Sequence, residues 1–398
     1  MHIGLVDLKW AGHHTPYVVY LTQYFVEEGH QVTFITDREN ERLDELPADD
    51  NFRVHTSSYP TVSGKTDTSF AVSLREQWNR TKQLRQVFDA ASDERVDVVH
   101  LLHFDGSQIP LWLASRLTDI NVPVVATIHR DAFLSPSGRN PGKRLTKLAT
   151  TLALDVTLET GTLDVLTVHA DPTRDRIIGG IDSATYNNTR TIPAPTPENS
   201  IDRSIEELRD DLSLPPERDL LLFFGGLREE KGPDILARLI REVDRPLTVV
   251  YAGSPSNFTA TDVDRWAEHV SPPVEILARL EFIPEDEVDA YFTAADALVL
   301  PYRRKRGISG PLRRAAMAET PVLSRARSDI GQIVEQHGLG ETFELDDVVG
   351  FRQALDSVLT DDESHSTRLR TFASSRHWSE TGDALLTIYE KMTSRKPN

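Results

Sequence analysis

Residues 298–324 read LVLPYRRKRGISGPLRRAAMAETPVLS, and this stretch contains the pattern that decides the fold. An apolar strand ends at Pro301, a basic loop follows, and a helix is predicted to open at Pro311. Ser309 or Gly310 is its predicted cap, so backbone N–H groups and the positive end of the helix dipole should form an anion site. The loop carries four cations in a chain whose formal net charge is −18: Arg303, Arg304, Lys305 and Arg306. These features point to a diphosphate pocket, and a solvated run of surface charge is the alternative.

The same strand–loop–helix unit recurs along the chain. Apolar strands alternate with helical segments, as in HIGLVDL, VDVVHLLHF, VPVVATIHR, DLLLFFGG and LTVVYAG. Near-continuous apolar strands separated by helices indicate an α/β protein with parallel sheets that are covered on both faces. The stretch TIPAPTPENS, residues 191–200, reads as a linker because it holds three prolines among polar neighbours. We therefore predict two doubly wound, Rossmann-like domains, residues 1–195 and 196–374, with a ligand-binding cleft at the carboxyl ends of their strands.

Composition limits the class of protein. At 398 residues the chain is too long for one ordinary core, and two domains are the natural division. It shows no signal peptide, and no apolar run approaches the roughly 20 residues that a spanning helix needs. With 39% hydrophobic residues, these features predict a soluble, cytoplasmic protein. The chain has no cysteine, which excludes disulfides, cysteine metal sites and thiol catalysis.

The balance of acidic and basic residues indicates the kind of organism the protein comes from and excludes one class of partner. Aspartate and glutamate total 62 and lysine and arginine 44, of which nine are lysine. This acidic, arginine-rich composition resembles that of proteins from salt-loving archaea, whose surfaces must stay soluble under strong ionic screening. A halophilic archaeal origin is therefore expected. A net charge of −18 repels phosphate backbones, so no nucleic-acid partner is expected.

Two further loops carry candidate anion-binding residues. FFGGLREEKGPDIL, residues 223–236, joins a strand to a helix, and Gly226 permits a sharp turn there. Arg228 and Lys231 can aim cations at the predicted cleft, and a solvated turn is the alternative. The loop after the first strand has residues that could contact a sugar, a phosphate or only solvent: Gly12, His13 and His14.

The remaining candidate binding residues are a histidine after a strand and a group of basic residues at the start of a helix. His129 directly follows a buried strand at its carboxyl end, which slightly favours a ligand contact over a structural role. GRNPGKRLTKL, residues 138–148, brings Lys143, Arg144 and Lys147 to the start of an apolar helix. This helix could rest on an anionic membrane surface or hold an acceptor phosphate, with a solvated helix start as the alternative. No metal site is expected.

Taken together, these motifs resemble those of the family 4 (group 1) glycosyltransferases, which have the GT-B fold. VPVVATIHRDA resembles the family's V-P-V-V-x-T-x-H-D segment, and FGGLREEKG resembles its F-G-R-L-x-x-x-K-G phosphate motif. ADALVLPY and PVLSR resemble the strands on either side of the donor-binding helix. The end of the chain, residues 375–398, resembles the closing helix that crosses back to the first domain.

The resemblance implies a glycosyltransferase that moves a sugar from a nucleotide-diphosphate sugar to a glycan or lipid-linked acceptor. It implies a retaining, metal-independent transfer without a cofactor, by a cytoplasmic protein that could contact the inner face of the membrane. His129 would be the catalytic histidine that holds the donor sugar, and the early loop would lie on the acceptor side. The donor diphosphate would bind a set of glycines, cations and a serine: Gly226, Arg228, Lys231, Gly307, Ser309 and Gly310.

The chain departs from the family in the donor motif. The family's E-G-F-G-L-P-x-x-E aligns without gaps with RGISGPLRR, so Arg306 and Arg314 replace two glutamates. The resemblance assigns the later glutamate to the ribose hydroxyls, and arginine cannot accept those hydrogen bonds. We therefore expect an altered donor, such as a uronic acid sugar. Two alternatives stay open: a catalytically silent GT-B partner in a glycan-assembly complex, and another GT-B enzyme such as an epimerase or a phosphorylase.

Overall fold

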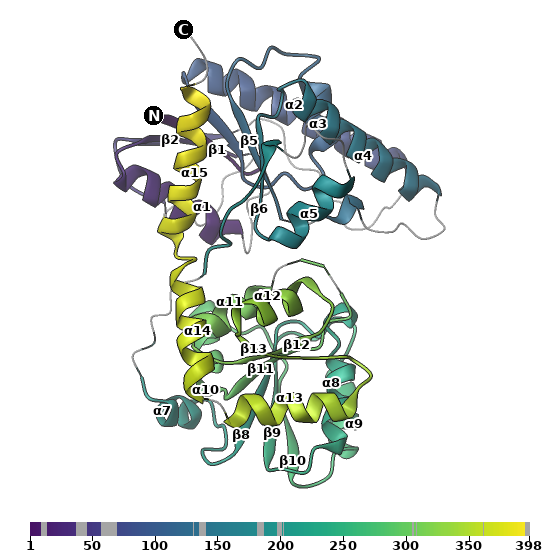
Figure 1. Ribbon diagram of the computed structural model, residues 1–398. Coiled ribbons are helices and arrows are strands. Elements are labelled where there is room, and N and C mark those ends of the chain that lie inside the picture. The colour runs from purple at the N-terminus through teal and green to yellow at the C-terminus, as the bar shows by residue number, and fades with distance from the viewer. Residues whose placement is uncertain are drawn as a thin grey trace. The chain divides into compact units, whose positions relative to one another are not determined.

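The chain folds into two compact units. The computed structural model describes residues 1–8, 14–36, 46–56, 70–129, 131–134, 141–180, 187–196, 201, 203–304, 306–307, 309–360 and 362–394. Unit 1 comprises Met1–Pro195 and Trp378–Asn398, and unit 2 comprises Thr196–His377. The first boundary falls within the proline-rich stretch, and the second lies just before the last helix (Figure 1).

Unit 1 contains a seven-stranded sheet in the order β3-β2-β1-β4-β5-β6-β7, and its described strand pairs are all parallel. Its strands are β1 (His2–Val6), β2 (Gln31–Thr36), β3 (Phe52–Thr56), β4 (Val98–Leu101), β5 (Val124–Ile128), β6 (Val165–Val168) and β7 (Thr189–Thr191). Its helices are α1 (His14–Glu27), α2 (Phe70–Asp93), α3 (Gln108–Ala114), α4 (Pro141–Glu159), α5 (Asp171–Gly180) and α15 (Trp378–Thr393).

Helices cover both faces of this sheet. Side chains of α2, α3, α4 and α5 share one buried cluster with alternate residues of the central strands. Side chains of α1 and α15 form the cluster on the other face, where the two helices lie side by side (Figure 1). Within it Trp378 stacks on Tyr20 with ring centroids 4.7 Å apart, and a 2.5 Å hydrogen bond joins the Tyr389 hydroxyl to Nδ1 of His100. The last helix is therefore part of the core of unit 1.

Unit 2 repeats the design with a six-stranded parallel sheet in the order β10-β9-β8-β11-β12-β13. Its strands are β8 (Asp219–Phe224), β9 (Leu247–Ala252), β10 (Val274–Arg279), β11 (Ala297–Leu300), β12 (Val322–Arg325) and β13 (Gly340–Phe343). Its helices are α7 (Ile205–Asp211), α8 (Pro233–Leu239), α9 (Ala260–Glu268), α10 (Glu285–Ala294), α11 (Gly310–Met317), α12 (Asp329–His337), α13 (Val348–Thr360) and α14 (Asp362–Ser374).

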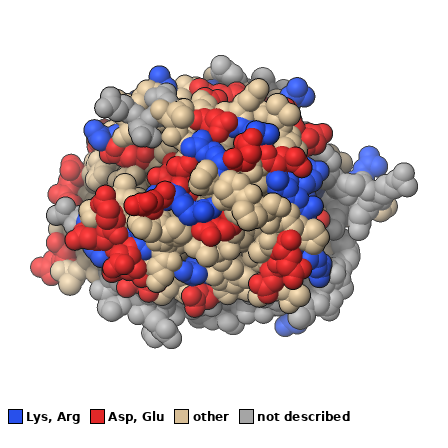
Figure 2. Space-filling view, turned by 90° about the horizontal axis from the view of Figure 1, so that it is seen from below, with Lys and Arg blue, Asp and Glu red and all other residues tan. Residues whose placement is uncertain are grey.

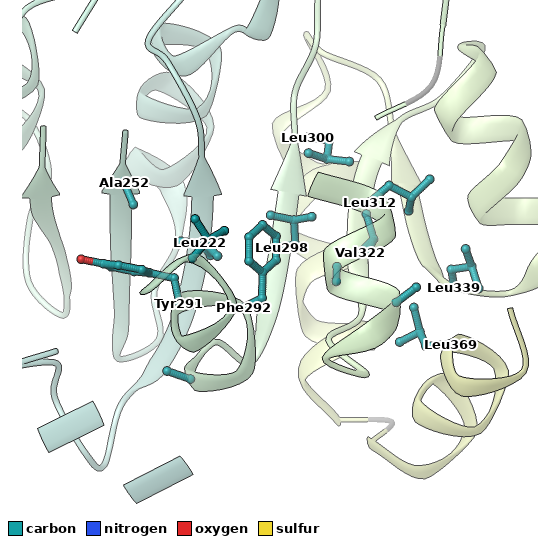
Figure 3. Packing of buried hydrophobic residues seen from close by; sticks show 14 of the residues in the cluster. Leu222, Ala252, Tyr291, Phe292, Leu298, Leu300, Leu312, Val322, Leu339 and Leu369 are labelled. Atoms are coloured by element: carbon teal, nitrogen blue, oxygen red, sulfur yellow. The ribbon is translucent and has the colours of Figure 1, made fainter. Parts of the chain in front are cut away.

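Two apolar clusters sandwich the second sheet. Figure 3 shows one of them, where Tyr291 and Phe292 of α10 and Leu312 of α11 pack against Leu222 and Leu298 of the central strands. On the opposite face α8, α9 and α13 bury the alternate strand residues. The predicted fold class, α/β with two doubly wound Rossmann-like domains, is confirmed. In each sheet the strand order reverses beside the first strand, between β1 and β4 and between β8 and β11, and such switch points are where open α/β sheets bind ligands.

Candidate functional site

The loop after β8 holds Lys231 at the switch point of unit 2. Gly225 follows the strand with a φ of +106°, a conformation that side chains rarely adopt. A Cβ atom at this position would lie 2.2 Å from Nζ of Lys231, so only glycine leaves room for the ammonium group. Gly232 is the N-cap of α8, at φ +68°, and a Cβ atom there would lie 2.2 Å from the carbonyl oxygen of Pro301. The loops after β8 and β11 therefore pack closely together.

The environment of Lys231 disfavours its positive charge. Burial, followed by the charges of Arg228 and Arg304, lowers the pKa of Lys231 from 10.5 to about 8. The Arg228 side chain is 61% exposed and lies 3.9 Å from Glu230. A partly desolvated ammonium beside two guanidinium groups is an arrangement that an anion stabilises, because the anion offsets all three charges.

The basic loop after β11 is only partly available for a ligand. Arg303 donates to both carboxylate oxygens of Asp234 on α8 and to the carbonyl oxygen of Glu229, 2.8 Å away. The guanidinium carbon of Arg304 lies 6.0 Å from the ring centroid of Tyr302. Arg303 therefore ties its loop to α8, and the four cations of the sequence are not equivalent. Lys305 lies outside the described residues.

The start of α11 agrees with the cap predicted from the sequence. Ser309 is the N-cap, its side chain accepts from the Leu312 N–H, and Gly310 is the first helical residue. Ser309 is buried, with 3% of its surface exposed. The Gly307 N–H, at φ +98°, donates to Oδ2 of Asp329 at 2.6 Å. The Gly307 N–H and the Ser309 side chain, both predicted to bind the donor diphosphate, therefore have hydrogen-bond partners within unit 2.

The two arginines that replace the family's glutamates differ in their surroundings. Arg314 donates to the carboxylates of Asp289 and Glu285, both on α10. Its side chain is 17% exposed, and burial, opposed by the Arg314 charge, raises the pKa of Asp289. The charge of Arg314 is thus offset within the α10–α11 pair. Arg306 is partly buried in the loop before α11.

In unit 1, His129 lies directly after β5 and is held by its neighbours. Its main-chain N–H donates to Oδ1 of Asp105 at 3.0 Å, and its Nε2 lies 2.8 Å from the carbonyl oxygen of Leu102. Because a carbonyl oxygen can only accept, Nε2 carries the proton in this arrangement. In the neutral ring Nδ1 is then an acceptor, the form that suits a sugar hydroxyl.

Sequence reasoning missed the companions of His129. The rings of His103 and His169 both lie 5.0 Å from the His129 ring, and the Tyr17 ring lies 5.7 Å away. The three histidines follow β4, β5 and β6, which are neighbours in the sheet. That order was the available signal, because residues after adjacent parallel strands meet at one edge. No group of acidic side chains or histidines that could hold a metal ion occurs among the described residues.

A pocket opens at the switch point between β1 and β4. Its cavity volume is about 20 Å³, which is room for about one water molecule. Arg80, Gln83, His103 and Ser107 line it together with apolar side chains of both strands. Arg80 donates to the carbonyl oxygen of Gly106 at 3.0 Å, and burial lowers its pKa. A cation, an amide, an imidazole and a hydroxyl group in one pocket suit a polar ligand.

The remaining predicted residues of unit 1 are described only in part. Gly12 and His13 lie outside the described residues, and His14 is the first residue of α1. Lys143, Arg144 and Lys147 occupy the first two turns of α4, where the Arg144 side chain is exposed. In the part of the chain that the structure describes, no helix has the length and hydrophobicity needed to cross a membrane.

Both units match domain families of known proteins. Residues 14–156 match the "Glycosyl transferase 4-like domain" and residues 218–361 match "Glycosyl transferases group 1". Together the two matches cover more than two thirds of the chain. Two similar proteins are D-inositol 3-phosphate glycosyltransferases. The one from Corynebacterium diphtheriae is 24% identical over 74% of this chain and 70% of its own, and the one from Xylanimonas cellulosilytica is 26% identical over 76% and 73%.

Solved structures share the fold. Sucrose-phosphate synthase from Thermosynechococcus elongatus superposes with a TM-score of 0.73 at 15% identity, over 100% of both chains. The Anabaena protein HepE, solved with UDP and glucose, superposes with a TM-score of 0.68 at 12% identity, over 98% of this chain and 100% of that one. With its two parallel-sheet units and a glycosyltransferase domain match in each, the chain belongs to the glycosyltransferases of the GT-B type.

Proposed function

We propose that this protein transfers a sugar from a nucleotide-diphosphate sugar to a hydroxyl group of a polar acceptor. One observation carries the proposal: Lys231, whose pKa is lowered, lies next to Gly225 at the switch point between β8 and β11. The loops after these two strands pack together there. A diphosphate would offset this costly charge and would also meet the capped start of α11. HepE, which shares the fold, binds UDP, UDP-glucose and glucose, which supports a nucleotide-sugar donor.

The proposed reaction needs stabilisation of the leaving diphosphate. The bond between the sugar C1 and the diphosphate oxygen breaks, the acceptor oxygen bonds to C1, and the hydroxyl proton passes to the diphosphate. Lys231 and Arg228 offset the charge that develops on the diphosphate, in the role that a metal ion has in other enzymes. We propose that His129, whose Nε2 donates to the Leu102 carbonyl oxygen, contacts a sugar hydroxyl group, as the family resemblance implies. We propose a metal-independent transfer that retains the anomeric configuration, in line with the family resemblance.

The pocket of unit 1 is too small to enclose an acceptor, and we propose that the acceptor's phosphate binds at its mouth. Arg80 and Ser107 provide hydrogen-bond donors for a phosphate group. The relatives named D-inositol 3-phosphate glycosyltransferase support an acceptor that combines hydroxyl groups with a phosphate. Lipid-linked glycans and polyol phosphates both have this chemistry. Arg80→Gln should therefore raise the KM for the acceptor and leave donor affinity unchanged.

Calorimetric titration tests the donor site directly. UDP, GDP and ADP are titrated into the full chain, and we expect one of them to bind. Lys231→Met should abolish this binding, whereas Lys391→Met, which neutralises an exposed lysine on α15, should preserve it. Absence of binding by all three nucleotides, or unchanged binding by Lys231→Met, would contradict the proposal.

Product analysis then tests the transfer. The enzyme is incubated with the nucleotide sugar that matches the bound nucleotide and with candidate phosphorylated acceptors, and products are detected by mass spectrometry. NMR of the anomeric proton reports retention, and activity that survives a chelator shows independence from metal ions.

One observation favours a second candidate function, a catalytically silent partner protein. Arg314 stands where the family has its ribose-binding glutamate, and it pairs with Asp289 and Glu285 on α10. Nucleotide binding without any transfer would support that candidate.

A further inference from the structure

Helix α4 exposes three leucines on one face. Leu145, Leu148 and Leu152 are 63%, 56% and 54% exposed, whereas Leu154 and Leu158 on the opposite face are buried against the sheet of unit 1. Spacings of three, four and seven residues place the three leucines in a single stripe along the helix. A stripe of large apolar side chains in water marks an interaction surface.

Helix α2 repeats the pattern. Leu74 and Trp78 are 55% and 47% exposed in its first half, and Nζ of Lys82 lies 5.9 Å from the centroid of the Trp78 ring. Both α2 and α4 follow a strand of a parallel sheet, so each begins near the carboxyl edge of that sheet. Helix α3 packs against both of them, so the three helices adjoin on one face of unit 1 (Figure 1). The two exposed apolar stretches therefore flank α3 at the same edge.

The charge around these stretches is opposite to that of the chain. Residues 141–154 of α4 hold three basic residues and no acidic one, and residues 70–88 of α2 hold four basic residues and one acidic one. The whole chain, by contrast, has 62 acidic residues against 44 basic ones. Arg75 and Arg85 on α2 and Arg144 on α4 are exposed. On the face of the molecule shown in Figure 2, by contrast, acidic side chains lie among the basic ones.

We propose that the first halves of α2 and α4 form a docking surface for a bilayer that contains anionic lipids. The docking surface comprises Leu74, Trp78, Leu145, Leu148 and Leu152, together with the exposed cations Arg75, Arg85 and Arg144. Leucine and tryptophan side chains enter the boundary between headgroups and acyl chains, and lysine and arginine bind anionic headgroups. Both chemistries are present on these two helices, and a bilayer of anionic lipids offers both complements at once. The inference is independent of the transfer reaction.

Vesicle flotation with the full chain tests the docking surface. The vesicles are phosphatidylcholine, with or without phosphatidylglycerol, at low ionic strength. We expect the protein to float only with phosphatidylglycerol vesicles and to dissociate as salt is added, because salt screens the charged contribution. Replacing Arg144 and Lys147 by glutamine should lower the partition coefficient about thirty-fold, because each cation contributes about a factor of five.

The triple variant Leu145→Ser, Leu148→Ser, Leu152→Ser tests the apolar contribution. We expect its partition coefficient to fall about a hundred-fold, because three half-exposed leucines no longer enter the bilayer. The matched control is Phe282→Ser with Val349→Ser, which removes two side chains of unit 2 that are 80% and 65% exposed. This control should float like the wild type. Circular dichroism of both variants confirms that the fold is intact.

Three results would overturn the proposal. They are failure of the wild type to float with phosphatidylglycerol vesicles, equal binding to both kinds of vesicle, and equal loss of binding in the triple variant and its control. Because flotation does not require a donor or an acceptor, a negative result here leaves the proposed transfer reaction standing. A protein that floats but transfers no sugar would in turn separate the two conclusions.

Discussion

Replacing Lys231 by methionine should stabilise unit 2 and remove its affinity for diphosphate at the same time. The ammonium group is partly desolvated beneath Gly225 and near Arg228 and Arg304, so the folded protein disfavours its charge. Methionine keeps an unbranched side chain of similar length without the charge. A residue that lowers stability in the absence of ligand is typical of a binding site.

The pKa of Lys231 sets the magnitude and the sign. Its fall from 10.5 to about 8 corresponds to about 3 kcal/mol of unfolding free energy. Between these two values the unfolded lysine binds more protons than the folded one, so the wild type becomes more stable as the pH rises. At pH 6.5 we expect the variant to be more stable by about 3 kcal/mol, and this advantage should shrink by about 2 kcal/mol at pH 9.5. Groups common to both proteins cancel in the difference.

Urea titrations at the two pH values measure the effect. Trp266 is the only tryptophan between residues 196 and 377, so the NMR signal of fluorotryptophan at this position reports the unfolding of unit 2 separately from unit 1. Lys391→Met, on an exposed surface of unit 1, is the control, and because it keeps Lys231 it should show the same pH slope as the wild type. Equal pH slopes for wild type and Lys231→Met would refute the reasoning, because the lysine would then titrate normally in the folded state.

Three further predictions concern local geometry and titration. Gly225→Ala should weaken binding of the nucleotide that the wild type prefers at least tenfold in calorimetry, because its Cβ atom displaces the lysine, whereas Gly161→Ala, also at positive φ but with nothing within 4 Å, should not. Arg314→Glu places a third carboxylate beside Asp289 and Glu285 of α10, and should lower the free energy of unfolding in urea by about 2–4 kcal/mol. Adding Asp289→Arg should restore part of this free energy, and no recovery would argue against the ion pair. Burial and the charge of His129 lower the pKa of His100 to about 3, so this residue should reduce stability below pH 6.5 by up to about 1.4 kcal/mol per pH unit. Acid titrations should show that His100→Gln has a shallower slope than the wild type by this amount.

Much of the fold could be predicted from local sequence. Apolar strands alternate with helices at spacings typical of parallel α/β folds, and both sheets have the doubly wound form. The cap at Ser309 followed from a serine and a glycine before Pro311, because capping depends on the nearest few residues. Lys231 and Gly225 lie in the same loop, so the sequence identified that loop as a candidate site, although it could not predict how close the two residues are.

The partners of the candidate site were not predictable in this way. Asp329, which accepts from the Gly307 N–H, lies on another helix, and Asp289, which pairs with Arg314, lies 25 residues away on α10. Likewise His103 and His169 approach His129 only because β4, β5 and β6 are adjacent in the sheet. Such contacts depend on the order of the strands, which no local pattern contains.

The sequence by itself therefore determined the class of fold, the helix cap and the loop that carries Lys231, because periodicity, capping and turn chemistry act between neighbours in the chain. Only the tertiary structure decided which of the cations have carboxylate partners and which histidines meet. It also decided which leucines of α4 remain in water. The physical reason is the same in each case, since the charge offset, the orientation of a ring and the burial of a side chain depend on residues brought together from distant parts of the sequence.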